Sequence, residues 1–126
     1  MSSFYNDIEL KGLGLRNYGK NVLISRNACI YGAENIEIGD NTRIDDFCVL
    51  SGKISLGANI HIAPFCLLAG GKKGIVIKDF SGLSSRVSLY AASDDYSGKS
   101  LTNPTIDEKY KKVVSKKVQY VYWHPS

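Results

Sequence analysis

The chain has 126 residues, 44% of them hydrophobic and 22% charged, which suits one domain with its own core and excludes disorder throughout. The net charge of +4 is concentrated in residues 107–126, where five lysines accompany two acidic residues, so no folded basic face for nucleic acid is expected. No apolar run approaches the ~20 residues that cross a bilayer, and we expect no membrane span.

The chain is predicted to be a single domain, residues 1–126, built from four consecutive segments. Residues 1–18 form a lead-in, 19–90 form repeated coils, 91–112 form an extended loop and 113–126 form an atypical tail. The lead-in lacks the positive flank and the apolar stretch of a signal peptide. A cytoplasmic protein is therefore expected.

A repeat of six residues dominates the predicted coils. Isoleucine or leucine recurs every sixth position, with a slip of two residues before Ile38 and a slip of three before Ile77. These anchor positions are Ile24, Ile30, Ile38, Ile44, Leu50, Leu56, Ile62, Leu68, Ile77, Leu83 and Leu89. Two residues before each anchor stands a small or apolar residue, and side chains at i and i−2 of a strand point to the same face. Each unit therefore predicts a short strand with two inward side chains.

The residues that follow the anchors suit sharp corners. Gly39 and Asn41 follow one anchor, and Gly57 and Asn59 follow another eighteen residues later. Glycine and asparagine tolerate the positive φ that a corner between very short strands requires. Three strands per turn make a triangular coil, and successive coils pair as parallel strands ~4.8 Å apart. The repeat predicts an all-β solenoid.

Residues eighteen positions apart are expected to stack on neighbouring coils. Cys48 and Cys66 are predicted to be small core residues, one above the other, and not a redox pair. Phe47, Phe65 and Phe80 each follow an anchor by three residues, and we expect them to form an aromatic ladder at one corner. The three cysteines and two histidines have no metal-ligand spacing, so no metal is expected.

Several units consist of an aliphatic residue, a glycine and four further residues. They include Ile38-Gly39-Asp40-Asn41-Thr42-Arg43 and Leu56-Gly57-Ala58-Asn59-Ile60-His61. These units resemble the hexapeptide-repeat acyltransferases, and this resemblance implies a left-handed parallel β-helix with an extended loop and an irregular C-terminal tail. The stretches 75–85, 93–98 and 101–105 are similar to the subgroup that acetylates sugars of bacterial surface polysaccharides.

The resemblance also implies a function. Members of this family move an acyl group from coenzyme A to a hydroxyl or an amine. For this chain we expect transfer of acetyl from acetyl-CoA to a sugar hydroxyl, with a sugar or sugar nucleotide as acceptor. They are usually homotrimers with active sites between subunits, and a histidine acts as general base on the acceptor. Imidazole suits that role because an alcohol is a poor nucleophile near pH 7, where the ring readily exchanges a proton.

His61 is the candidate catalytic base. It is the histidine that lies within the repeat, and it directly precedes the anchor Ile62, so it is expected to point outward beside Arg43 of the previous coil and Gly82 of the next. An ordinary surface histidine would show the same pattern, and that alternative stays open. His124, in the tail, is the weaker candidate.

The predicted loop supplies the candidate acceptor contacts. Asp94, Asp95, Tyr96 and Asn103 are candidate sugar-binding residues, since carboxylates, phenols and amides recognise hydroxyl groups. A solvated turn at the two aspartates is the alternative. No residue is assigned to the coenzyme A site.

The repeat does not resume after Leu89, and residues 113–126 have no glycine-containing corner. The resemblance therefore implies a C-terminally truncated member of the family. An alternative function follows: a non-catalytic β-helix scaffold that lacks a complete coenzyme A site.

Overall fold

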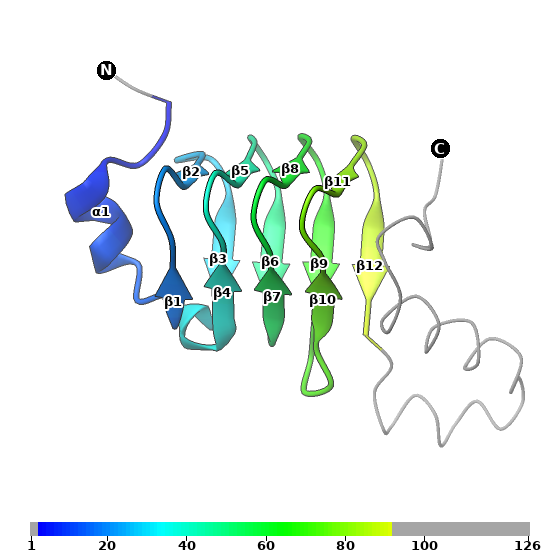
Figure 1. Cartoon of the computed structure of the whole chain (residues 1–126). Helices are drawn as coiled ribbons and strands as arrows, with labels where there is room; N and C mark the ends of the chain where they lie inside the picture. The colour runs from blue at the N-terminus through cyan, green and yellow to red at the C-terminus, as the bar shows by residue number, and fades with distance from the viewer. Residues whose placement is uncertain (1–2, 92–126) are drawn as a thin grey trace, which may run out of the picture.

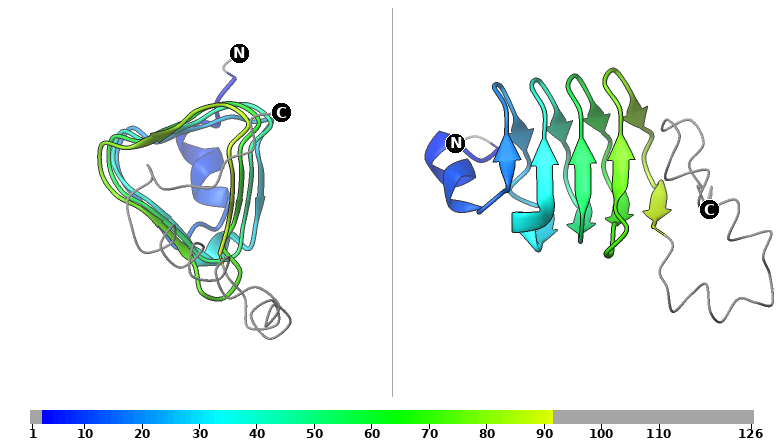
Figure 2. Two further views of the ribbon diagram at one scale, coloured as in Figure 1. Left: turned by 90° about the vertical axis from the view of Figure 1, so that its right-hand side faces the viewer. Right: turned by 60° about the horizontal axis from the view of Figure 1, so that its bottom comes forward.

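The computed structural model describes residues 3–91 of the chain. Over this range, three parallel sheets of four strands each form the sides of a triangular prism, and the chain visits them in turn (Figures 1 and 2). The nearly all-β, left-handed parallel β-helix expected from the sequence is confirmed for these residues. The predicted loop and tail lie outside the described residues, apart from Ala91.

The three sides are named here in the order in which the chain reaches them. Sheet I contains β1 (Asn17–Tyr18), β4 (Ile36–Ile38), β7 (Ile54–Leu56) and β10 (Ile75–Ile77). Sheet II contains β2 (Leu23–Ile24), β5 (Arg43–Ile44), β8 (His61–Ile62) and β11 (Gly82–Leu83). Sheet III contains β3 (Cys29–Tyr31), β6 (Val49–Ser51), β9 (Leu67–Ala69) and β12 (Ser88–Tyr90).

The register of sheet II shows how the two slips in the repeat are accommodated. Leu23 pairs with Arg43, Arg43 with His61, and His61 with Gly82, so successive coils contain 20, 18 and 21 residues. The two extra residues lie at the 3₁₀ helix η1 (Ala33–Asn35), and the three extra ones lie in the turn before β10. Both insertions fall between sheet III and sheet I (Figure 1), so the stacking of the other two corners is undisturbed.

The core consists of the predicted inward columns. Every anchor except Ile30 has at most 4% of its surface exposed, and Ile30 packs partly buried against the same core. The second column contributes further buried residues, including Thr42, whose hydroxyl donates a hydrogen bond to the Gly57 carbonyl at 2.9 Å. The prism is therefore filled from end to end by aliphatic side chains.

A short helix, α1 (Asp7–Gly12), covers the N-terminal end of the prism (Figure 2). Asn6 and Glu9 form a capping box in which each side chain accepts a hydrogen bond from the other residue's backbone N–H at 2.9 Å. Leu10 is buried against the first coil. No helix among residues 3–91 is long and apolar enough to span a membrane.

The corners partly follow the prediction. Asn41 and Asn59 adopt positive φ, as expected. Gly39 and Gly57 do not, and they are needed for a different reason. A Cβ at Gly39 would lie 2.5 Å from the Gly57 carbonyl carbon, so the glycines allow neighbouring coils to approach closely.

The predicted aromatic ladder is wrong in one member. Phe47 and Phe65 stack with ring centroids 5.3 Å apart, at the corner between sheets II and III. Phe80 instead lies at the corner between sheets I and II, below Asn59, and its backbone N–H donates to the Ala58 carbonyl. Equal spacing from an anchor does not define a corner, because successive anchors belong to different sheets. Arg86 occupies the place below Phe65, and its guanidinium lies 5.6 Å from the Phe65 ring centroid.

Candidate functional site

His61 projects outward from β8 because the alternation of a strand places the next residue, Ile62, in the core. Parallel pairing of β5 with β8 sets Arg43 directly beside it on the previous coil. Both side chains are about half exposed, at 47% for Arg43 and 49% for His61. The structure thus confirms the expected outward direction and both expected neighbours, since Gly82 of β11 pairs with His61 on the next coil.

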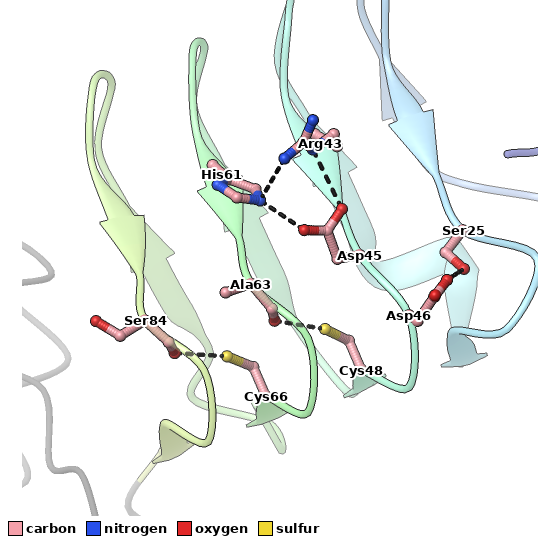
Figure 3. Close-up of polar contacts among 9 residues, drawn as sticks. All are labelled: Ser25, Arg43, Asp45, Asp46, Cys48, His61, Ala63, Cys66 and Ser84. Atoms are coloured by element: carbon pink, nitrogen blue, oxygen red, sulfur yellow. Dashed lines mark hydrogen bonds and ion pairs between the residues drawn. The ribbon is translucent and has the colours of Figure 1, made fainter. Parts of the chain in front are cut away.

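Three side chains on this face form a connected polar cluster, Arg43–Asp45–His61 (Figure 3). The Nε2 atom of His61 lies 2.6 Å from Oδ2 of Asp45 and 2.9 Å from Nη2 of Arg43. Oδ1 of Asp45 accepts from Nε of Arg43 at 3.1 Å. The Asp45 side chain is only 18% exposed, so its carboxylate is better shielded from water than its two partners.

Asp45 is a member of the cluster that the sequence analysis did not single out. A signal was present, since Arg43 and Asp45 flank the inward anchor Ile44 and so both face outward. The spacing does not tell whether the Asp45 carboxylate turns toward His61 or toward Ser25, the partner of the adjacent Asp46. That choice is visible only in the structure.

His61 and Arg43 line an open groove of about 660 Å³ on the outer side of sheet II. The corner residues Asn41, Asn59 and Phe80 form its other wall. The groove therefore combines a polar cluster, side-chain amides and one aromatic ring that is 79% exposed. Such a lining offers hydrogen-bond donors and acceptors for a hydroxylated or amino ligand, with an apolar surface beside them.

The other candidate residues fall outside the part of the chain that the structure describes. Asp94, Asp95, Tyr96, Asn103 and His124 all belong to residues 92–126, so their proposed roles stay predictions. Within residues 3–91 no group of three or more histidine, cysteine or acidic side chains could hold a metal ion.

The two stacked cysteines are core residues, as predicted. Cys48 is 0% and Cys66 1% exposed, and their thiols donate to the carbonyls of Ala63 and Ser84 at 3.1 Å each (Figure 3). The neighbouring Cys66 thiol, together with burial, raises the pKa of Cys48. Within residues 3–91, neither thiol forms a hydrogen bond with the polar cluster on sheet II.

Comparison with known proteins identifies relatives of this chain. No family model matches the chain. A curated relative, dTDP-4-amino-4,6-dideoxy-D-glucose acyltransferase from Escherichia coli, is 41% identical over 116 residues, which is 90% of this chain and 60% of the relative. The chain thus spans less than two thirds of that relative's length.

Solved structures of AntD, an N-acyltransferase from Bacillus cereus, are also similar. AntD in complex with dTDP and 3-hydroxybutyryl-CoA is 54% identical with a TM-score of 0.72, over 78% of this chain and 52% of that one. A variant in complex with dTDP-4-amino-4,6-dideoxyglucose and coenzyme A is 52% identical with a TM-score of 0.73, over 87% and 59%. The acyltransferase resemblance predicted from the repeat is confirmed: this chain is similar in sequence to a dTDP-4-amino-4,6-dideoxy-D-glucose acyltransferase, and in sequence and fold to AntD, an N-acyltransferase.

Proposed function

We propose that the chain acts in a coenzyme A-dependent acyltransferase that moves an acyl group from acyl-CoA to a sugar carried by a nucleotide. The observation that carries this proposal is the 54% identity to AntD, whose structure contains dTDP and 3-hydroxybutyryl-CoA. The curated relative, named for acylation of a dTDP-linked amino sugar, supports the same substrate class. A homotrimer and the roles of Asp94, Asp95, Tyr96 and Asn103 in acceptor binding remain part of the proposal.

The acceptor atom is proposed to be an amino nitrogen. The sequence resemblance pointed to a sugar hydroxyl and an acetyl group, with a use in surface polysaccharide synthesis. Both relatives are described as acting on an amino sugar or as N-acyltransferases, and this favours the amine. A neutral amine is also a stronger nucleophile than a hydroxyl group. It can therefore begin its attack on the carbonyl carbon before a base removes its proton.

His61 is proposed as the group that moves the proton. It accepts the proton that the acceptor nitrogen loses while this nitrogen attacks the thioester carbonyl carbon. The ring then donates the same proton to sulfur as the carbon–sulfur bond breaks, so amide and free coenzyme A thiol form and His61 is restored. The half-exposed ring in an open groove supports this role, because an acceptor can reach it.

The groove wall is proposed to orient the acceptor. The amides of Asn41 and Asn59 suit hydroxyl groups of a sugar, and the exposed ring of Phe80 suits its apolar face. A volume of about 660 Å³ lies within the range of small-molecule sites, roughly 300–1,000 Å³.

A transfer assay tests the proposal. The purified protein is mixed with acetyl-CoA or 3-hydroxybutyryl-CoA and dTDP-4-amino-4,6-dideoxyglucose, with the corresponding 4-hydroxy sugar nucleotide as second acceptor, and free thiol is measured. We expect release of coenzyme A with the amino sugar. His61→Gln should lower kcat by about a hundredfold or more, the scale of a lost general base. His124→Gln tests the weaker candidate in the same assay: with His61 as the base it should retain the turnover of the unchanged protein, and a comparable loss would move the role to His124.

The outcomes separate the function from the residue. Turnover that survives His61→Gln would remove His61 from the mechanism and leave the acyltransferase standing. Absence of turnover with every donor and acceptor, with no thermal shift on adding coenzyme A to the folded protein, would favour the non-catalytic scaffold.

A further inference from the structure

The Nε2 atom of His61 is in hydrogen-bond contact with two different groups. Asp45 offers a carboxylate oxygen at 2.6 Å, which can only accept, and Arg43 offers a guanidinium nitrogen at 2.9 Å, which can only donate. One ring nitrogen cannot donate to the first and accept from the second at the same time. The geometry therefore forces a choice of where the ring carries its proton.

The shorter contact decides the choice. A nitrogen lone pair facing a carboxylate oxygen at 2.6 Å would be a repulsive contact between two acceptors, whereas an N–H donating to that oxygen is a short, charge-assisted hydrogen bond. The guanidinium has another partner, because its Nε donates to Asp45 Oδ1 at 3.1 Å. The proton thus belongs on Nε2, between the ring and Asp45.

We propose that Asp45 is a positioning residue, which holds the proton of His61 on Nε2 and leaves Nδ1 as the atom that receives the acceptor's proton. This inference deepens the proposed function and rests on it for its catalytic meaning. In Figure 3 the second ring nitrogen lies on the side of the ring away from Asp45. When Nδ1 takes the proton from the attacking nitrogen, both ring nitrogens carry hydrogen, and the Asp45 carboxylate balances the charge that appears on the ring.

Arg43 sets the direction of Asp45. Its Nε–Oδ1 contact fixes one carboxylate oxygen, so that the other points at His61. If the carboxylate is replaced by an amide, its oxygen is a weaker acceptor and holds the proton on Nε2 less firmly. Donation from Arg43 to Nε2 then competes, and the neutral ring is expected to shift toward the form with the proton on Nδ1.

Nitrogen NMR on the full chain tests the assignment without any need for activity. The chain is labelled with ¹⁵N-histidine, and because it contains only two histidines, His124→Gln leaves the signals of His61 alone. In the neutral ring we expect a protonated Nε2 and an unprotonated Nδ1. The opposite pattern, with the proton on Nδ1, would overturn the proposal.

Two substitutions show whether Asp45 is the cause. Asp45→Asn should move the neutral ring toward the form with the proton on Nδ1. Glu37→Gln is the matched control, since it also removes one carboxylate but on sheet I, where Glu37 pairs with Arg16 at 3.5 Å; it should leave the His61 signals unchanged. Circular dichroism of both variants confirms that the solenoid is folded.

Kinetics connect the assignment to the reaction. Asp45→Asn should lower kcat by about ten- to a hundredfold, less than His61→Gln, with little change in KM for the amino sugar. An unchanged kcat in a variant whose ring proton has moved would overturn the positioning role. If the protein lacks transferase activity altogether, the NMR result still decides where the proton lies, so failure of the proposed function is recognised separately.

Discussion

Seven residues other than glycine have positive φ in residues 3–91, and they divide by corner. The corner between sheets I and II carries Asn21, Asn41, Asn59 and Phe80, and the three asparagines are of a residue type that tolerates this conformation. Phe47, Phe65 and Arg86 form the other column, where each strained backbone costs about 1 kcal/mol or more. The stacked rings, 22° from parallel, and the guanidinium beside Phe65 offset part of that cost.

Thiol reactivity is a prediction at the residue scale. A thiolate is needed for attack on a disulfide reagent, and Cys48 is completely buried with a raised pKa, while Cys66 is 1% exposed. In the folded protein we expect Cys29, which is exposed, to react rapidly and the other two to react only after unfolding. The measurement is the number of cysteine thiols per chain that have reacted with a disulfide reagent, followed over time in buffer and in denaturant.

Cys29→Ser is the control for this assignment. It should abolish the rapid phase and leave the two slow thiols unchanged. A second rapid thiol in the unsubstituted folded protein would contradict the burial of the cysteine stack.

At the scale of elements, α1 covers the exposed end of the N-terminal coil and buries Leu10 against its core. Its Glu9 contacts Arg26 at 2.6 Å, and Arg26 also lies 5.6 Å from the centre of the Tyr5 ring. The hydrogen bond from Arg26, and then the one from the Asn6 backbone, hold the pKa of Glu9 below its ordinary value. The ion pair thus joins the helix to the corner that follows β2.

The lowered pKa of Glu9 predicts how the stability that α1 contributes changes in acid. A carboxyl whose pKa is lower in the folded protein than in the unfolded chain stabilises the fold above its unfolded pKa, and this contribution is lost as the pH falls through the folded pKa. Glu9→Gln should therefore lower the melting temperature at pH 7, and the difference from the unchanged protein should shrink from roughly pH 5 to pH 3. Thermal unfolding at several pH values measures it.

The control is Glu34→Gln, which removes an exposed carboxylate on η1, at the corner between sheets III and I, whereas Arg26 lies at the corner between sheets II and III. Its melting temperature should follow that of the unchanged protein at every pH. A Glu9→Gln difference that stayed constant from pH 7 to pH 3 would show that the ion pair does not contribute.

At the scale of the whole molecule, stability comes from coils that stack without gaps. Each coil alone would leave both edges of its strands unpaired, and its neighbours supply the missing partners. Close approach at the corner between sheets I and II depends on Gly39 and Gly57, where backbone lies against backbone. Any side chain larger than the hydrogen of glycine at that corner would force the two neighbouring coils apart.

Alanine at this corner is therefore expected to destabilise the solenoid. The new Cβ in Gly39→Ala would meet Gly57 backbone atoms at 2.5 and 2.6 Å, and the coils must shift at a cost of about 1–3 kcal/mol. Gly12→Ala introduces the same methyl group at the end of α1, where nothing lies within 4 Å, and should stabilise by up to about 1 kcal/mol. Chemical denaturation compares the two, and equal effects would contradict the steric argument.

The sequence by itself determined the solenoid, because its period of six is a local consequence of strand alternation and corner chemistry. It placed Ile62 inside and His61 outside, and the 18-residue coil already put Arg43 beside His61. The period does not say which corner an anchor leads to once insertions occur, and for that reason Phe80 was assigned to the wrong ladder.

Only the tertiary structure decided the contacts of the candidate site. The Asp45 carboxylate had two directions open to it, and the guanidinium of Arg43 selects the one toward His61. The groove between that cluster and Phe80 likewise depends on where neighbouring coils bring their corners. Backbone periodicity is set by each six-residue unit alone, whereas side-chain direction on an outer face is set by neighbours one coil away.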